Sequence, residues 1–253
     1  MRWLCFLLAS TAAAQGAGGA GGGRPVKPLR FDLAAIPVTR DSFTFFLDRQ
    51  AHGFAVWQYE TRSRAPHDEV VYSAYSEFQP VEEERLRVVL DRTTGAPLAS
   101  YHHIELFSPR SDTLMVEHDL EVKDGRVQGT RKVGTKDGKV KAIPVSVPLP
   151  PGTVWSNYEL YAAAVTNAEP GDSLAAPDYR EFSDSLRTLY FFAEQPTAVN
   201  VPAGRFDVLP LRSGDFRLYV TRQPPRRVVK GETLDGRFSF ELAHTGPVVP
   251  TDP

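Results

Sequence analysis

Two histidines and one arginine are the residues whose types and spacing are best suited to binding a ligand. His102 and His118 lie in neighbouring segments in which apolar and polar residues alternate. A symmetric hairpin between these segments pairs His102 with His118, and the Asp-Gly turn that follows places Arg131 opposite His118. The three side chains then form a row across three strands, on a face that is otherwise apolar.

This row has three interpretations. Two imidazoles and a guanidinium can bind the anionic group of an amphiphile at the mouth of an apolar cavity. Two imidazoles can also begin a metal site, but a complete site needs a third or fourth ligand, so we expect no metal and no cofactor. The row can also lie at the solvated end of the sheet. All three depend on the register, because a slip of one residue turns the set to the other face.

Other kinds of chemistry find little support. Ser213-Gly214-Asp215 is typical of a turn, no G-x-S-x-G elbow is present, and no glycine-rich phosphate loop occurs. The acidic run 81–84 (VEEE) is interpreted as a solvated loop before a strand. We therefore expect no catalytic residue and no enzyme activity.

Aromatic side chains are frequent in the segments that resemble strands. The run Leu189–Phe192 is apolar at every position, which predicts a strand buried on both sides. These aromatics can fill the core, or they can line a cavity for a hydrophobic ligand on a concave sheet. In the second case Trp57, Tyr190 and Phe192 are candidate ligand-binding residues.

The elements that position these residues are mostly strands. A dozen short segments rich in aromatic or β-branched residues lie between Phe43 and Leu242, and Asp124-Gly125 and Asp137-Gly138 predict two tight hairpins. One helix is expected to begin at Ser156, in a capping box, and to end before Pro170. The predicted fold is mainly β: an antiparallel curved sheet or half-barrel with one helix packed on its concave face. The alternative is a sandwich with the helix at an edge.

The ends of the chain predict its compartment and boundaries. Residues 1–14 have the charge, apolar core and small-residue ending of a secretory signal, followed by a flexible glycine-rich leader at 15–28. One β-rich domain is expected over 29–244, followed by a proline-rich tail at 245–253. The single cysteine, Cys5, lies inside the signal, and Thr11 stands where a lipoprotein would need cysteine, so we expect an exported, periplasmic or secreted chain that is not lipidated. The balance of 29 basic against 31 acidic residues argues against a nucleic-acid partner.

A resemblance to a known family lies in the C-terminal half. The segment Val199–Val208 (VNVPAGRFDV) precedes Phe216–Thr221 (FRLYVT) and Pro224–Lys230 (PPRRVVK). This order resembles exported bacterial proteins of the domain-of-unknown-function family 3108 and is similar, more loosely, to lipoprotein carriers of the LolA and LppX type. The resemblance implies an antiparallel half-barrel over a helix with an apolar cavity, and it implies no catalytic residue.

Together these features predict a non-enzymatic exported protein of the cell envelope that binds a hydrophobic or amphiphilic ligand, such as a lipid. Peripheral association with the envelope is compatible with this function. The alternative is a structural or interaction module of the envelope with a filled core. Binding of an amphiphile by the purified protein would distinguish the two.

Overall fold

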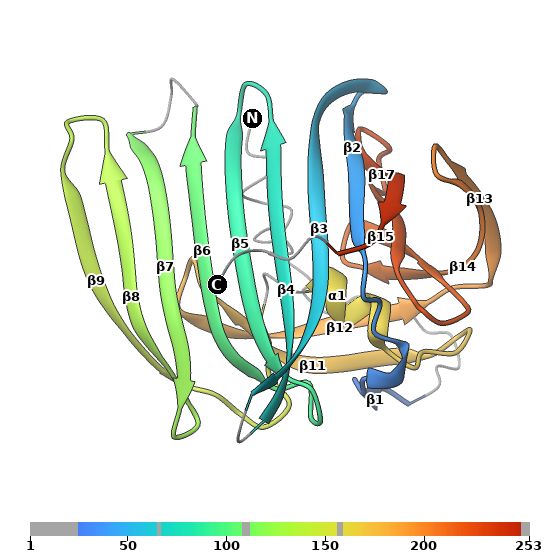
Figure 1. The fold of residues 1–253 in the computed structure, drawn as a ribbon, viewed down its shortest axis with the longest axis horizontal. Helices are drawn as coiled ribbons and strands as arrows, with labels where there is room; N and C mark the ends of the chain where they lie inside the picture. The colour runs from blue at the N-terminus through green and yellow to red at the C-terminus, as the bar shows by residue number, and fades with distance from the viewer. Residues whose placement is uncertain (1–24, 65–66, 108–111, 156–158, 249–253) are drawn as a thin grey trace.

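The computed structural model describes residues 25–64, 67–107, 112–155 and 159–248. Their strands form one large sheet in the order β1-β10-β11-β12-β13-β14-β15-β16-β17-β2-β3-β4-β5-β6-β7-β8-β9. Neighbouring strands are antiparallel except that β1 and β10 both pair with β11 in parallel. The mainly β prediction is confirmed, with the correction that the sheet is mixed rather than wholly antiparallel. The sheet does not close into a barrel (Figure 1).

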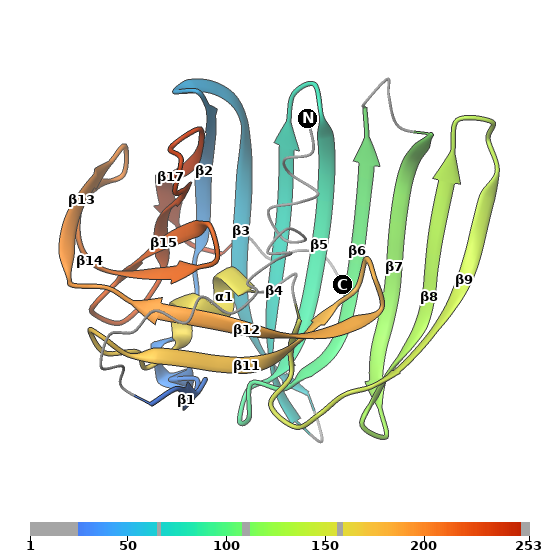
Figure 2. The ribbon, with the colours of Figure 1, turned by 180° about the vertical axis from the view of Figure 1, so that it is seen from behind.

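The sheet has a long antiparallel part and a part that crosses it. The long part contains β2 (Arg40–Leu47), β3 (Gln50–Arg64), β4 (His67–Phe78), β5 (Glu82–Asp91), β6 (Pro97–Leu106), β7 (Thr113–Lys123), β8 (Arg126–Thr135), β9 (Val140–Pro148) and β17 (Phe238–Gly246). The remaining strands are β1 (Lys27–Pro28), β10 (Val154–Trp155), β11 (Ser173–Arg180), β12 (Ser185–Ala193), β13 (Thr197–Val201), β14 (Gly204–Ser213), β15 (Phe216–Thr221) and β16 (Val228–Thr233). Figure 2 shows β11 and β12 running across the long strands, so the sheet folds over its own inner face.

An aromatic cluster fills the interior where β17, β2 and β3 meet. Trp57 is 5% exposed, and its ring centroid lies 4.0 Å from that of Phe43 and 5.3 Å from that of Phe240. Side chains two residues apart on a strand share a face, so the odd-numbered aromatics of β2 and β3 all point inward. Around Trp57, the packing supports the filled-core alternative.

A short 3-10 helix spans Leu33–Ala35, and the single α-helix of the described residues, α1 (Glu159–Val165), lies inside the fold. The ring centroid of its Tyr161 lies 5.6 Å from that of Tyr59 and 6.3 Å from that of Tyr72, and the helix also contacts β10, β15 and β16. Its alanines 162–164 are completely buried, and their small side chains let the helix backbone approach the strands. The predicted start at Ser156 lies outside the described residues, and the helix ends earlier than predicted because Thr166 pairs with Phe31 in a β-bridge.

The two Asp-Gly sequences form different turns. Asp124 and Gly125 have φ values of 51° and 69°, so the predicted tight turn between β7 and β8 is confirmed. Between β8 and β9, Gly138 has a positive φ and Asp137 does not, and Thr135 closes the loop through the carbonyl of Lys139. This second connection therefore has three residues rather than two.

The strand β12 corrects one prediction. Leu189, Phe191 and Ala193 are buried, but Tyr190 and Phe192 are 51% and 40% exposed. The strand is thus buried on one face only, because its outer face at Tyr190 and Phe192 is not covered by the described residues. Its partner β11 (sequence SLAAPDYR) was not predicted at all, since alanine and proline disfavour strands.

The described sheet extends slightly beyond the predicted domain. It begins at Lys27, inside the expected leader, and ends at Gly246, inside the expected tail. The predicted signal at 1–14 lies outside the described residues. Among the described residues, no helix is long and apolar enough to span a membrane.

One margin of the sheet is the strand β9. It pairs with β8 on one side and contains Pro144 and Pro148. Lys139, just before β9, and Lys141, within it, are exposed. Proline lacks an N–H group and charged lysine resists burial, so this margin is poorly suited to pairing with another strand.

We predict that Gly129→Ala destabilises the protein far more than Gly125→Ala. Both glycines have positive φ, but a Cβ atom at Gly129 would lie 2.1 Å from the carbonyl oxygen of Asp119, whereas nothing lies within 4 Å at Gly125. Urea unfolding should show a loss of about 1 kcal/mol for Gly125→Ala and of roughly 3 kcal/mol for Gly129→Ala. Equal losses would contradict the close approach of β7 and β8.

Candidate functional site

The predicted row of three side chains is present in the sheet. His102 of β6 pairs with His118 of β7, and His118 pairs with Arg131 of β8. The hairpin register is therefore confirmed. Both imidazoles lie on the inner face at 1% and 0% exposure, so the row is not at a solvated end of the sheet.

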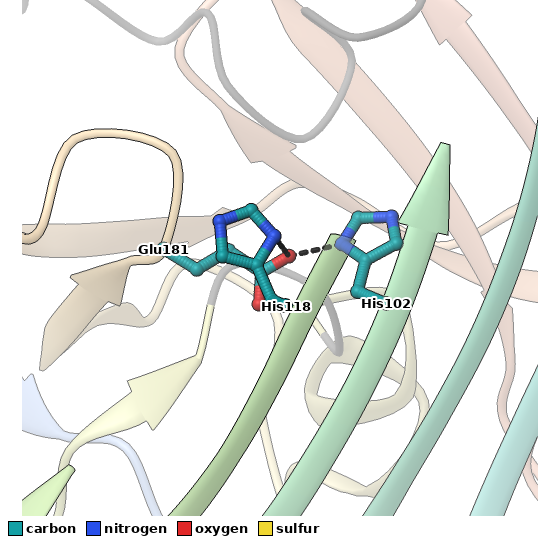
Figure 3. Close-up of side chains that lie close together, drawn as sticks. All are labelled: His102, His118 and Glu181. Carbon is teal, nitrogen blue, oxygen red and sulfur yellow. Dashed lines mark hydrogen bonds and ion pairs between the residues drawn. The ribbon is translucent and has the colours of Figure 1, made fainter. Parts of the chain in front are cut away.

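A buried carboxylate completes the cluster. Glu181 follows β11 directly and is 2% exposed, and its Oε1 atom contacts Nδ1 of His102 in a short hydrogen bond and lies 3.9 Å from Nδ1 of His118. Figure 3 shows this carboxylate between the two rings. The crossing part of the sheet thus places a carboxylate next to the two histidines. We call His102, His118 and Glu181 the His–His–Glu cluster.

His102 lies between two carboxylates. Its Nδ1 faces Glu181, and its Nε2 lies 2.6 Å from Oε1 of Glu84. Burial by itself lowers the pKa of His102, but the two carboxylates outweigh this effect and raise that pKa to about 10. Burial raises the pKa of Glu181, but the charge and the hydrogen bond of His102, together with a smaller effect of His118, more than offset burial, so the net pKa of Glu181 is lowered. Without another ligand, His102 is therefore an imidazolium that donates to both acids.

His118 is in a different state from its neighbour. Among the described residues, neither of its ring nitrogens has a hydrogen-bond partner, although both are buried. Burial lowers the pKa of His118, and the charges of His102 and Arg131 lower it further against the opposing effect of Glu181. The imidazole is thus neutral, with a buried lone pair that nothing in the described chain satisfies.

Arg131, the predicted anion ligand, has partners within the chain itself. Its guanidinium lies 3.0 Å from Oδ2 of Asp184 and donates to the backbone carbonyls of Glu181 and Phe182. These contacts use its charge to fix the segment that carries Glu181. Carboxylates of the chain itself thus lie where a ligand anion was expected, and binding of an anion by this row stays a prediction.

An aromatic side chain covers the cluster. The ring centroid of Phe182 lies 5.5 Å from that of His102 and 5.1 Å from that of His118, and its plane is nearly perpendicular to both rings. Phe182 therefore limits access of water, and it lowers the local polarity. Any group bound by the cluster would lie in a largely dry environment.

The other three predicted site residues lie elsewhere. Trp57 packs in the aromatic cluster beside Phe43 and Phe240. Tyr190 and Phe192 lie on the outer face of β12, and the structure does not bring them together with Trp57 or with the row. The six predicted residues thus lie in three places: the row, the aromatic cluster around Trp57 and the outer face of β12.

Sequence reasoning missed two members of the site. Glu84 was assigned to a solvated loop, but residues 82–84 begin β5, and the side chain of Glu84 is 17% exposed and accepts a hydrogen bond from Ser76. Glu181 has no local signal, because it follows a strand that was not recognised. The alternation of buried residues in β5 could have assigned Glu84 to the inner face.

Buried charges also precede Glu181 at the end of β11. Asp178 is fully buried, and Nε of Arg180 lies 2.5 Å from its Oδ2 atom. Burial raises the pKa of Asp178 to about 6, against the opposing effects of Arg180 and Arg187. The carboxyl of Asp178 therefore ionises at a higher pH in the folded chain than in the unfolded chain.

This shift predicts a specific dependence of stability on pH. The folded chain holds the proton of Asp178 more tightly, so its contribution to stability is largest below pH 3.8 and falls as the pH rises to about 6. Compared with Asp178→Asn, the wild-type protein should lose about 3 kcal/mol of unfolding free energy across this window. Urea unfolding of both proteins between these pH values measures the loss. A difference that stays constant with pH would contradict the raised pKa.

Comparisons with known proteins give limited information. The sequence matches no family model and no curated protein. Among solved structures, it is similar to a "putative exported protein with YmcC-like fold" from Bacteroides fragilis, with 11% identity over 87% of this chain and 98% of that chain. The TM-score of 0.31 is too low to support a conclusion about fold or function. The resemblance to the domain-of-unknown-function family 3108 and to LolA-type carriers stays a prediction.

Proposed function

We propose that the protein is exported and that it binds an anionic amphiphilic surface, such as a lipid headgroup layer, without catalysing a reaction. One observation carries this proposal: Tyr190 and Phe192 lie exposed on the outer face of β12 beside Arg212. The proposal keeps the predicted ligand class and moves the binding site from an internal cavity to this outer face. We call Tyr190, Phe192 and Arg212 the outer aromatic face.

The outer aromatic face combines two properties of interfacial sites. Arg212 pairs with Phe192 across β12 and β14, and its guanidinium lies 5.5 Å from the centre of the Phe192 ring. Aromatic rings are favoured where one side is apolar and the other wet, and arginine binds phosphate and carboxylate groups. The guanidinium interacts weakly with Glu194, at 3.9 Å, so its charge is largely available.

A second aromatic pair on the outside of the sheet has the opposite charge environment. Phe54 and Tyr75 lie 5.8 Å apart on β3 and β4, and Arg85 lies over the Tyr75 ring. Here the guanidinium of Arg85 forms a 2.6 Å ion pair with Glu83, and acidic side chains surround Tyr75. This pair should repel an anionic surface and is a matched control.

Export is supported by the sequence of residues 1–14. The proposal includes the absence of enzyme activity. The segment that most resembles a nucleophile motif, Ser213-Gly214-Asp215, is consistent with this. Ser213 pairs with Phe216 across the turn that Gly214 and Asp215 form between β14 and β15. These residues complete a hairpin and need no catalytic explanation.

Vesicle binding tests the proposal. The protein should sediment with vesicles of phosphatidylcholine and phosphatidylglycerol in equal amounts, and much less with phosphatidylcholine alone. Tyr190→Ser/Phe192→Ser should weaken binding at least about tenfold, because two apolar side chains no longer enter the interface. Arg212→Gln should weaken binding to the anionic vesicles only.

The matched control is Phe54→Ser/Tyr75→Ser, which should leave vesicle binding unchanged. Equal losses in both double variants would mean that exposed aromatics bind vesicles without selectivity, and the proposal would fail. If the wild-type protein binds neither kind of vesicle, the interaction module with a filled core becomes the better function.

A further inference from the structure

The three donor atoms of the His–His–Glu cluster have the spacing of a metal site. One ligand atom from each of His102, His118 and Glu181 lies within 4.8 Å of the other two. Tetrahedral zinc, with bonds of about 2.0–2.1 Å to nitrogen and oxygen, sets its ligand atoms roughly 3.3 Å apart. A small opening of the contact between His102 and Glu181, with a small approach of His118, brings the three atoms to this spacing.

His118 supplies the observation that points to a ligand. It is completely buried, and among the described residues neither ring nitrogen has a hydrogen-bond partner. Buried polar groups almost always have partners, and a neutral imidazole nitrogen with a free lone pair is the usual metal ligand. Its Nδ1 atom already lies 3.9 Å from the carboxylate oxygen of Glu181 (Figure 3), close to the spacing that a shared cation would require.

The surroundings of the cluster match the second shell of a metal site. A metal-binding histidine commonly donates its other N–H group to a carboxylate, which fixes the ring and raises its basicity. Nε2 of His102 lies 2.6 Å from Glu84, and Ser76 holds the second oxygen of Glu84 at 3.0 Å. On the other side, Arg131 and Asp184 hold the segment that carries Glu181.

The charges around the cluster suit a divalent cation. The carboxylates of Glu84 and Glu181 both contact the ring of His102, and that of Glu181 also faces His118. Buried charges are stable only when they are paired. A divalent cation balances the charge of both carboxylates and uses a ring nitrogen of His118.

We propose that His102 Nδ1, His118 Nδ1 and a carboxylate oxygen of Glu181 bind a divalent first-row transition-metal ion of the zinc type. Two imidazoles and one carboxylate are a donor set that zinc accepts, with a fourth position for water. The metal joins the long part of the sheet, through β6 and β7, to the segment between β11 and β12. This site lies on the inner face of the sheet and is independent of the outer aromatic face.

The test uses the purified protein after removal of metals with a chelator. Titration with Zn²⁺, followed by calorimetry, should show one ion per chain with micromolar or tighter affinity. Co²⁺ should give visible absorption of a tetrahedral complex, which Zn²⁺ removes. His118→Gln should weaken Zn²⁺ binding at least tenfold and abolish the Co²⁺ absorption.

His103→Gln is the matched control. His103 is the next residue on β6, faces outward, and contacts Glu117 and Glu105 instead of the cluster. The substitution His103→Gln should change the affinity for Zn²⁺ by less than a factor of two. If His103→Gln removes the ion and His118→Gln does not, the metal binds the outer face and the proposal is wrong.

A second variant and a second measurement show whether a loss of binding comes from misfolding of the variant. Glu181→Gln preserves the size of the side chain and removes the anionic ligand, so it should also weaken binding. Zn²⁺ should raise the melting temperature of the wild-type protein and of His103→Gln, and leave those of His118→Gln and Glu181→Gln unchanged. If the wild-type protein binds no Zn²⁺ at 100-fold excess over chain and its melting temperature does not move, the cluster is a proton-held network and the proposal is overturned.

Discussion

The apolar face of a sheet must be shielded from water. In this chain, another part of the same sheet shields it. The strands β2–β9 present their inner residues toward β11 and β12, which continue the sheet and cross it (Figure 2). The helix α1 fits between these parts because alanines form its centre and Tyr161 stacks on the strands. The meeting of Glu181 with two histidines that belong to another part of the chain depends on this crossing.

Local chemistry was sufficient to predict the site wherever strands follow one another closely. The Asp124-Gly125 turn fixes the pairing of β7 with β8, and alternation fixes which face His118 occupies. That reasoning placed His102, His118 and Arg131 in one row. It could not identify their partners, because Glu181 is 79 residues from His102 in sequence and no repeating pattern links the two.

The errors have a common physical origin. In β12, apolar residues occupy both faces, and only the position of the strand in the folded sheet determines which face is covered. In β5, the acidic residues resemble a loop, yet Glu84 points toward a buried histidine that carries the opposite charge. In both cases a tertiary contact overrides the hydrophobicity of the local segment.

The prolines of β9 affect how copies of the protein associate with one another at high concentration. A sheet of this size ends in open margins, and an open margin is a template on which another chain can add a strand. Pro144 and Pro148 remove two backbone donors from β9, and Lys139 and Lys141 add positive charge along it. Lateral growth from one molecule to the next is therefore disfavoured at this margin, and the chain avoids aggregation there without needing a partner to cap it.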